Sequence, residues 1–381
     1  MNYPTYVKNC INALESAGFS AYAVGGAVRD SLLGTEPADW DVTTSATPDE
    51  ILSVFADHRT IPTGIKHGTV TVLFGNDAGT LPIEITTFRI DGEYLDSRHP
   101  ESVSFSRNLR DDLSRRDFTV NAMAFNEREG LVDFFGGKED LEKEIIRAVG
   151  DPKKRFSEDA LRILRAFRFS AQLSFEIDKR TLEGAYVCSH LLSNIARERI
   201  GVEFKKLLAS FGAVYSLTKM IKGGVWNEIF GLPAPDAELV NSLEELDERH
   251  FAPRLSVLIS YLSEKEREEL LSSLRLSNDE KKTVLRLCRI KDFVISENED
   301  ISVFARRFLH YWGDIFEFSF DIFCFWHKET ADIQKCILKE FLENRPLTVS
   351  ALAIKGSDIL PLCEGDTKGL GRRLNFCLKE L

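Results

Sequence analysis

The chain has 381 residues, of which 43% are hydrophobic and 29% are charged, and it carries a net charge of −11. This apolar content is enough to bury a large core, which excludes an intrinsically disordered protein. No apolar run is long enough to span a membrane, and the first residues lack the basic and apolar regions of a signal peptide. We therefore expect a cytoplasmic protein with no membrane partner.

The cysteine pattern excludes two further classes. The seven cysteines are odd in number, scattered along the chain and never spaced as CxxC. Such a pattern indicates neither a disulfide framework nor a zinc site. They are Cys10, Cys188, Cys288, Cys324, Cys336, Cys363 and Cys377.

Charge is distributed unevenly along the sequence. Residues 1–135 hold 11 Lys and Arg against 20 Asp and Glu, whereas residues 136–210 hold 15 against 12. The acidic total argues against non-specific nucleic-acid binding. An acidic region followed by a basic one nevertheless fits an enzyme that holds a metal with the first and a polyanion with the second. Ordinary solvated faces are the alternative interpretation.

The first 135 residues have an α/β pattern. An amphipathic opening helix precedes a short strand that ends at Val24, and a helix follows from Ala27 to Leu33. Two β-rich runs, residues 69–74 and 81–88, are separated by the turn-rich GNDAGT. This spacing predicts an antiparallel pair.

Helical periodicity dominates from Gly137 onward, with almost no strand signal. We expect helices over residues 139–149, 157–172, 195–211 and 256–274. Gly, Pro and Asp mark soft breaks at 136–137, 231–236 and 344–347. The predicted fold class is α+β: an N-terminal head with a small mixed or antiparallel sheet, followed by an all-helical remainder.

A pair of carboxylates is the first candidate for chemistry. Asp39 and Asp41 begin a β-prone run, and two positions apart on a strand they point to one face. Carboxylates on one face suit Mg²⁺ ions that also hold a triphosphate. Glu84 is a third candidate, because it alternates with the apolar Ile83 and Ile85 in a predicted strand. For an isolated pair, a solvated turn is the alternative.

A glycine pair lies fifteen residues upstream, in VGGAVRD at 24–30. Gly25 and Gly26 lead into a helix, so backbone N–H groups can approach phosphate oxygens and Arg29 can bind them with its guanidinium. A tight turn is the alternative, and neither a dinucleotide fingerprint nor a P-loop is present. A phosphate loop followed by paired carboxylates on the next strand is typical of nucleotidyl transfer.

Four ordered motifs carry a family resemblance: VGGAVRD at 24–30, DWDVTT at 39–44, RRDFTVNAMAF at 115–125 and SEDALRILRAFRF at 157–169. With them the chain resembles class II tRNA nucleotidyltransferases, the CCA-adding enzymes and their bacterial poly(A) polymerase relatives. The resemblance continues at 62–73, 83–105, 196–208 and 352–360 and is weak after about residue 210. No His-Asp dipeptide occurs, so an appended HD phosphohydrolase domain is not expected.

The resemblance implies a role for each matching residue. Asp39 and Asp41 are implied to bind the catalytic metals, and Asp159 and Arg162 to read the base. The contacts implied for the nucleotide triphosphate are Gly26, Arg29 and Arg116. Arg165 and Arg168 are implied to support the helix and its phosphate contacts, and Glu158 is implied to orient the base-reading pair. Asp117 and Asn121 are implied to hold the ribose or the fold around it.

Base reading also follows from residue chemistry. On one helix, Asp159 and Arg162 are neighbours that offer an acceptor beside a permanent donor. Cytosine and adenine both present an amino donor beside a ring-nitrogen acceptor, whereas uracil and guanine present the reverse. A fixed Asp/Arg pair therefore accepts CTP and ATP and rejects UTP and GTP without a template. An ordinary helix ion pair is the alternative.

The expected reaction is attack of the tRNA 3′ hydroxyl on the α-phosphate, with pyrophosphate leaving. Bound metal removes the need for a dedicated protein base. His67 and His99 are the histidines near the motifs, and we expect both to be structural.

By resemblance, residues 1–136 form a catalytic head, 137–210 a neck that recognises the base, and 211–300 and 301–381 a body and tail that bind the acceptor and T arms of tRNA. Lys153, Lys154, Arg155, Lys205 and Lys206 are candidates for phosphate contact.

Three activities share these motifs, and full CCA addition is the favoured one. Residues 89–105 resemble the flexible loop that relatives need for the final A, which disfavours a CC-adding enzyme but not an A-adding one. Residues 63–72 resemble the Gram-positive CCA type, and no basic extension suggests a poly(A) polymerase. A catalytically inactive tRNA-binding protein remains the alternative from another class.

Overall fold

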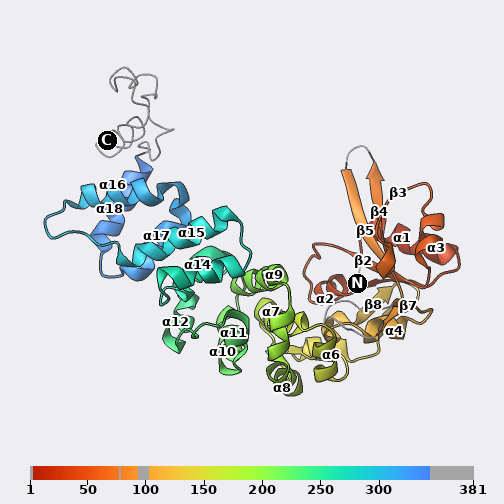
Figure 1. The fold of residues 1–381 in the computed structure, drawn as a ribbon. Coiled ribbons are helices and arrows are strands. Elements are labelled where there is room, and N and C mark those ends of the chain that lie inside the picture. The colour runs from red at the N-terminus through yellow and green to blue at the C-terminus, as the bar shows by residue number, and fades with distance from the viewer. Residues whose placement is uncertain (1–2, 77–78, 93–102, 344–381) are drawn as a thin grey trace, which may run out of the picture. The chain divides into compact units, whose positions relative to one another are not determined.

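The computed structural model describes residues 3–76, 79–92 and 103–343, and the chain forms two compact units, Met1–Ala234 and Pro235–Leu381. Figure 1 shows the strands gathered in the first unit and helices in the second. The expected α+β class with a helical remainder is confirmed. The finer division into head, neck, body and tail stays a prediction.

A seven-stranded mixed sheet forms the centre of the head, in the order β3-β4-β5-β2-β1-β8-β9. β2 and β5 are parallel, and the other neighbours are antiparallel. The predicted pair at 69–74 and 81–88 is the antiparallel β4–β5 pair, with longer strands. The strand bounds are β1 Ala21–Val24, β2 Asp41–Thr44, β3 Arg59–Gly64, β4 Thr69–Asn76, β5 Gly79–Thr87, β8 Met123–Asn126 and β9 Gly130–Asp133.

Short helices complete the head, together with a separate two-stranded sheet. The helices are α1 Thr5–Ser16, α2 Gly26–Leu32, α3 Pro48–Val54 and α4 Leu109–Ser114, with 3-10 turns at Ile65–His67 and Thr119–Asn121; β6 Arg89–Asp91 pairs antiparallel with β7 Val103–Phe105. Sequence chemistry explains where α3 begins. Thr47 and Glu50 form a capping box around its first turn, and Pro48 occupies a position whose N–H needs no partner.

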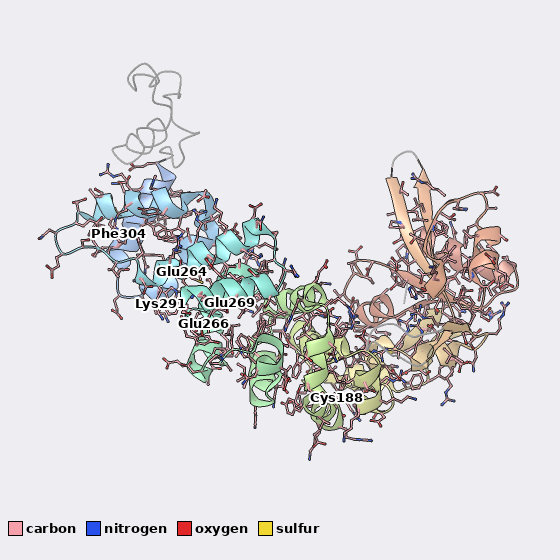
Figure 2. The ribbon with its side chains drawn as sticks, viewed as in Figure 1. Cys188, Glu264, Glu266, Glu269, Lys291 and Phe304 are labelled. Carbon is pink, nitrogen blue, oxygen red and sulfur yellow. The ribbon has the colours of Figure 1, made fainter. Side chains whose placement is uncertain are left out.

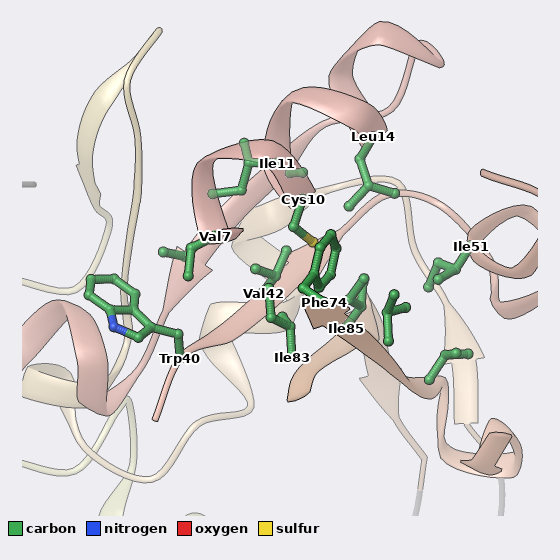
Figure 3. Close-up of a cluster of buried hydrophobic side chains, with 14 of the residues drawn as sticks. Val7, Cys10, Ile11, Leu14, Trp40, Val42, Ile51, Phe74, Ile83 and Ile85 are labelled. Atoms are coloured by element: carbon green, nitrogen blue, oxygen red, sulfur yellow. The ribbon is translucent and has the colours of Figure 1, made fainter. Parts of the chain in front are cut away.

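The main core of the head lies between α1 and the sheet (Figure 3). The buried face of α1 consists of Val7, Cys10, Ile11 and Leu14, which recur at helical spacing. They pack in one cluster with alternate residues of β2 and β5, namely Val42, Ile83 and Ile85. Because apolar residues of β5 point into this cluster, the residue between them points out of it.

The helical segment that follows belongs to the same compact unit. Its bounds are α5 Gly137–Glu142, α6 Pro152–Glu158, α7 Leu161–Leu173, α8 Lys179–Val187, α9 Arg197–Leu208, α10 Ala213–Lys222 and α11 Val225–Phe230, with a 3-10 turn at Ser189–Asn194. The expected helix over 139–149 is wrong beyond Glu142, because β10 (Ile145–Ile146) pairs in parallel with β11 (Glu176–Ile177). This pairing joins segments thirty residues apart, so local periodicity does not reveal it.

The second unit is helical throughout its described part. Its bounds are α12 Ala237–Asn241, α13 Phe251–Leu258, α14 Glu264–Ser273, α15 Asn278–Cys288, α16 Ile301–Trp312, α17 Phe316–Trp326 and α18 Ala331–Leu342, with 3-10 turns at Ser242–Glu245, Arg289–Asp292 and Gly313–Ile315. The expected helix over 256–274 is therefore two helices. Ser263 and Glu266 form the capping box that starts α14, the second of these helices. In α16, Phe304, labelled in Figure 2, is fully buried. None of the helices built by the described residues is long and apolar enough to cross a membrane.

Candidate active site

The turn between β1 and α2 brings two arginines against two glycines. Gly25 has a φ of +76°, a conformation that favours glycine. A Cβ at Gly25 would lie 3.0 Å from Nη1 of Arg116, and a Cβ at Gly26 would lie 3.7 Å from Nη2 of Arg29. Small residues here therefore let both guanidinium groups approach the backbone.

Three predicted carboxylates meet at the start of β2. Trp40 is buried, and its ring centre lies 6.0 Å from that of Tyr3. Asp39 and Asp41, its neighbours on either side in the chain, are exposed. Glu84 is the register partner of Asp41 across the parallel β2–β5 pair, and it is also exposed. One detail of the prediction is wrong: β2 begins at Asp41, so Asp39 lies in the preceding loop rather than in a strand.

The surroundings of these three carboxylates leave their charge uncompensated among the described residues. No described residue donates a hydrogen bond to Asp39, Asp41 or Glu84, and none forms an ion pair with them. Water reaches Asp41, yet protein atoms surround it closely, and this partial burial raises its pKa to about 6. The charge of Arg116 opposes that rise, while the negative charges of Asp39 and Glu84 add to it. The cluster therefore has an excess of negative charge that a cation would relieve.

The donor set fits a metal that arrives with a nucleotide. Among residues 3–76, 79–92 and 103–343, no three His, Cys, Asp or Glu side chains already form a metal cage. Mg²⁺ is commonly held by one or two carboxylates together with substrate phosphates. Oxygen ligands, an incomplete cage and unpaired charge all suit such an ion.

Arg116 has donors to spare beside this cluster. Its Nη2 lies 3.4 Å from Oδ2 of Asp112, which is its one ion-pair partner among the described residues. Its Nε is buried and makes no hydrogen bond to any described residue, whereas its Nη1 lies at the glycine turn. Arg116 therefore offers a fixed positive charge next to the carboxylates, with Nη1 toward the turn, as a phosphate site requires.

Asp112, which was not predicted from the sequence, contacts Arg116. It is fully buried, and its Oδ1 accepts from Nε and Nη2 of Arg115 at 3.0 and 2.7 Å. Its Oδ2 accepts from the hydroxyl of Thr43 at 3.1 Å. Burial alone would raise its pKa, but the charges of Arg115 and Arg116 with these hydrogen bonds lower it overall. The spacing of three and four residues from Asp112 to Arg115 and Arg116, which follow the end of α4 at Ser114, was the available signal.

A hydrogen-bond chain connects α2 to the helix α7. Nη1 of Arg29 donates to Oδ1 of Asn121 at 2.7 Å, and Nδ2 of Asn121 donates to Oδ1 of Asp117 at 3.1 Å. Asp117 in turn accepts from Nε and Nη2 of Arg165 at 2.8 and 2.6 Å. Arg29 also pairs with Asp30 and is only 9% exposed. The structure thus places Asp117 and Asn121 as links between the two groups of predicted site residues.

Asp159 and Arg162 do not share a helix, which corrects the prediction. α6 ends at Glu158, Asp159 has an extended backbone, and α7 begins at Leu161. The carboxylate of Asp159 accepts from N–H of Leu161 at 3.1 Å, which competes with a continuous helix. The stretch from 157 to 172 is therefore two helices, and the two side chains meet partners other than each other.

The side chains of Asp159 and Arg162 both form ion pairs with other residues. Nη2 of Arg199, on α9, lies 2.9 Å from Oδ2 of Asp159. Arg162 pairs with Glu158 at 2.9 Å and also donates to the carbonyl of Arg115 at 2.8 Å. The contact between Glu158 and Arg162 agrees with the expected orienting role, which itself stays a prediction.

The remaining predicted arginines of α7 share a buried carboxylate. Nη1 of Arg165 and Nε of Arg168 lie 3.7 and 2.5 Å from the carboxylate of Glu203 on α9. The guanidinium of Arg168 also lies 3.6 Å from the ring centre of Phe169. Glu203 and Arg199 were missed as individual residues, although the segment 196–208 that contains them was among those carrying the resemblance.

Comparison with known proteins agrees with this geometry. Residues 21–147 match the family model of the poly A polymerase head domain, and residues 174–239 match a model described as a probable RNA and SrmB-binding site of polymerase A. The CCA-adding enzyme of Leuconostoc mesenteroides is 43% identical over 280 residues, covering 72% of this chain and 68% of that one. The CCA-adding enzyme of Streptococcus suis is 42% identical over 296 residues, covering 76% and 72%.

The chain belongs to the CCA-adding enzyme family. A solved structure supports the same conclusion: the Bacillus stearothermophilus CCA-adding enzyme in complex with CTP matches with a TM-score of 0.79 at 28% identity, covering 100% of this chain and 94% of that one. Membership of this family makes the chain a nucleotidyltransferase and implies dependence on a divalent metal.

Proposed function

We propose that the chain adds CCA to the 3′ end of tRNA from CTP and ATP, without a nucleic-acid template, and releases pyrophosphate. The observation that carries the proposal is the cluster of three carboxylates that have no hydrogen-bond or ion-pair partner among the described residues and lie beside the charge of Arg116. The names of the relatives specify which transfer reaction this cluster serves. The reaction is expected to take place in the cytoplasm.

Asp39 and Asp41 are the proposed metal ligands, with Glu84 as a further catalytic carboxylate on the neighbouring strand. Mg²⁺ is the proposed ion, because carboxylate and phosphate oxygens are its preferred ligands. When bound, it supplies Lewis-acid activation of the hydroxyl and neutralises charge on the leaving pyrophosphate. Asp41 is ionised at neutral pH, because its pKa of about 6 lies below that pH.

The proposed triphosphate contacts are Arg116, Arg29 and the backbone of Gly26. Arg116 places Nη1 next to the glycine turn, so it would bind phosphate oxygens and hold the α-phosphate near the carboxylates. Arg29 is tied to Asp30 and Asn121, so its main contribution is a fixed positive charge near Gly26. His67 is exposed on a 3-10 turn, and His99 lies outside the described residues.

Base selection is proposed to use Asp159 and Arg162. Arg199 orients Asp159, while Glu158 and the Arg115 carbonyl orient Arg162. Arg165 and Arg168 support α7 through Asp117 and Glu203. In this arrangement an incoming base either adds to these contacts or displaces Arg199 from Asp159.

Binding of tRNA through its acceptor and T arms is proposed for the helical regions. Lys153 and Lys154 are exposed at the start of α6. In the second unit, a cavity of about 840 Å³ combines cations with aromatic rings; it is lined by Asn278, Lys281, Lys282, Leu285, Arg286, Arg289, Asp292, Phe293, Arg307, Tyr311 and Trp312. Basic groups beside aromatic faces suit RNA. Arg289 also pairs with Glu264, labelled in Figure 2.

Arg155 is a weaker candidate for phosphate contact than the lysines beside it. Its guanidinium pairs with Glu158 at 2.9 Å and donates to the carbonyl of Ser114 at 3.1 Å. Its place in the structure thus favours a role in holding α6 against the head.

Single-nucleotide incorporation tests the proposal. Purified protein with Mg²⁺ is given tRNA transcripts that end at the discriminator base, at C or at CC, with CTP and ATP separately and together. Growth by three nucleotides from the discriminator base, followed by a stop, is the expected result.

Other products would overturn the proposal in specific ways. Growth from the CC transcript alone would indicate an A-adding enzyme, and growth that stops after two cytidines a CC-adding one. A long ladder would indicate a poly(A) polymerase, and no growth with intact tRNA binding an inactive tRNA-binding protein.

A further inference from the structure

Asp112 occupies a place in the active site that neither metal binding nor substrate contact explains. It lies on α4, is fully buried and carries a lowered pKa, so it is ionised. A buried carboxylate persists as an anion only where partners compensate its lost hydration. Two guanidinium groups and one hydroxyl supply that compensation here.

We propose that Asp112 is the positioning residue for nucleotide binding: it holds Arg116 between Gly25 and Asp41, so that Nη1 of Arg116 remains for the triphosphate. The proposal rests on the proposed role of Arg116 as a triphosphate contact.

Asp112 ties Arg116 to the two strands that carry the carboxylates. Thr43 lies two residues after Asp41 on β2, so both side chains leave the same face of the strand. The Thr43 hydroxyl lies 3.1 Å from Oδ2 of Asp112 and 3.1 Å from the carbonyl of Thr86 on β5. The position of Arg116 is therefore set relative to β2 and β5, which carry Asp41 and Glu84.

The charge balance also assigns different tasks to the two arginines. Arg115 binds Oδ1 of Asp112 through two nitrogens at 3.0 and 2.7 Å. Arg116 makes one long contact of 3.4 Å to Oδ2. Arg115 thus neutralises the buried carboxylate, while Arg116 is oriented by it and keeps a net positive charge for the site.

The contacts also exclude Asp112 as a metal ligand. Arg115 fills Oδ1, while Thr43 and Arg116 share Oδ2. By contrast, Asp41 accepts no hydrogen bond from a described residue. The two carboxylates lie near the same arginine but have opposite surroundings, which separates a positioning role from a ligand role.

A double-mutant cycle tests the proposal. Steady-state incorporation and equilibrium titration of CTP would be compared for the wild type, D112N, R116M and D112N/R116M. Because Asp112 acts through Arg116, D112N should raise KM and Kd for CTP about tenfold in the wild-type background and cause no further change in R116M. KM for tRNA should stay unchanged.

R115M provides the matched control, because it removes the other cation from the same carboxylate. Its KM for CTP should rise less than that of D112N, because Asp112 still orients Arg116. If D112N unfolds below the assay temperature, D112N/R115M replaces it, since that variant removes the buried carboxylate together with the guanidinium that neutralises it, and its KM for CTP should exceed that of R115M alone.

Two results would overturn the proposal. The first is that D112N raises KM and Kd for CTP by the same factor in the wild-type and R116M backgrounds. The second is that R115M raises KM for CTP as much as D112N does. Failure of the proposed function is distinguishable, because a wild type that binds CTP but adds no nucleotide leaves the Kd cycle readable. A wild type that binds no CTP would overturn both.

Discussion

The carboxylate cluster of the head and the charged cluster of α6, α7 and α9 have opposite characters. Asp39, Asp41 and Glu84 have no hydrogen-bond or ion-pair partner among the described residues. In the second cluster, Asp159 and Arg162 are bound to other protein groups. Unpaired charge marks the place where ligands supply the missing partners, whereas paired charge sets the shape of a recognition surface before a ligand arrives.

The largest expected effect is on the unpaired cluster. D41N should lower incorporation by about a thousandfold, because it removes a proposed metal ligand. Its melting temperature without metal should hold or rise, because burial and two neighbouring negative charges disfavour the ionised Asp41. Gel assays and thermal melts measure both, with tRNA binding retained as the control. A fall in melting temperature together with normal incorporation would contradict the metal assignment.

D117N should cause the next largest effect, on stability. Burial would raise the pKa of Asp117, but Arg165 and its hydrogen bonds lower it to about 2. Removing one partner of a buried ion pair costs about 3 kcal/mol of unfolding free energy. Urea unfolding of the wild type and D117N gives that difference.

The same pair predicts a pH dependence. Since its folded-state pKa lies below the ordinary 3.8, Asp117 contributes stability above about pH 4 and loses it as the pH falls toward 2. The gap in unfolding free energy between the wild type and D117N should therefore shrink across that window. A gap that stays constant would show that the carboxylate charge contributes nothing.

Substitutions in the base-reading pair should have a smaller effect than those above, and the effect should be on the choice of nucleotide. R162A should relax the rejection of UTP by about tenfold, because the donor beside Asp159 is lost. R199M should shift selection in the same direction by a smaller factor, since Asp159 loses the partner that orients it. Competition between CTP and UTP on one transcript measures the ratio. Unchanged rejection of UTP in R162A would count against base reading.

The smallest effect concerns the basic cavity of the second unit. The charge reversal K281E/K282E should raise KM for tRNA a few-fold and reduce the salt slope of binding by about one or two. The control is K265E, an exposed lysine on α14 that pairs at 3.8 Å with Glu269, labelled in Figure 2. Equal effects of the two changes would mean a general charge effect rather than a binding site.

The sequence predicted features that depend on local pattern. Glu84 leaves the core because Ile83 and Ile85 enter it, and the β1 strand ends one residue before Gly25 as the motif suggested. The active-site residues implied by the resemblance all lie in the first compact unit, Met1–Ala234.

Features set by distant partners were not predictable from the sequence. Asp159 leaves the helix because its carboxylate binds N–H of Leu161 and it pairs with Arg199, forty residues away. Asp112 also binds Thr43, 69 residues away, which its local spacing to Arg115 and Arg116 does not reveal. Composition and periodicity contain no trace of the contacts with Arg199 and Thr43.

The central claim is that the unpaired carboxylates and Arg116 together form a site for a metal-bound triphosphate. Calorimetric titration of CTP into the wild type and D41N, each in Mg²⁺ and in EDTA, tests it most directly. The account predicts that EDTA weakens CTP binding to the wild type by at least about tenfold and leaves D41N almost unaffected. Equal CTP affinity in Mg²⁺ and EDTA for the wild type would contradict it.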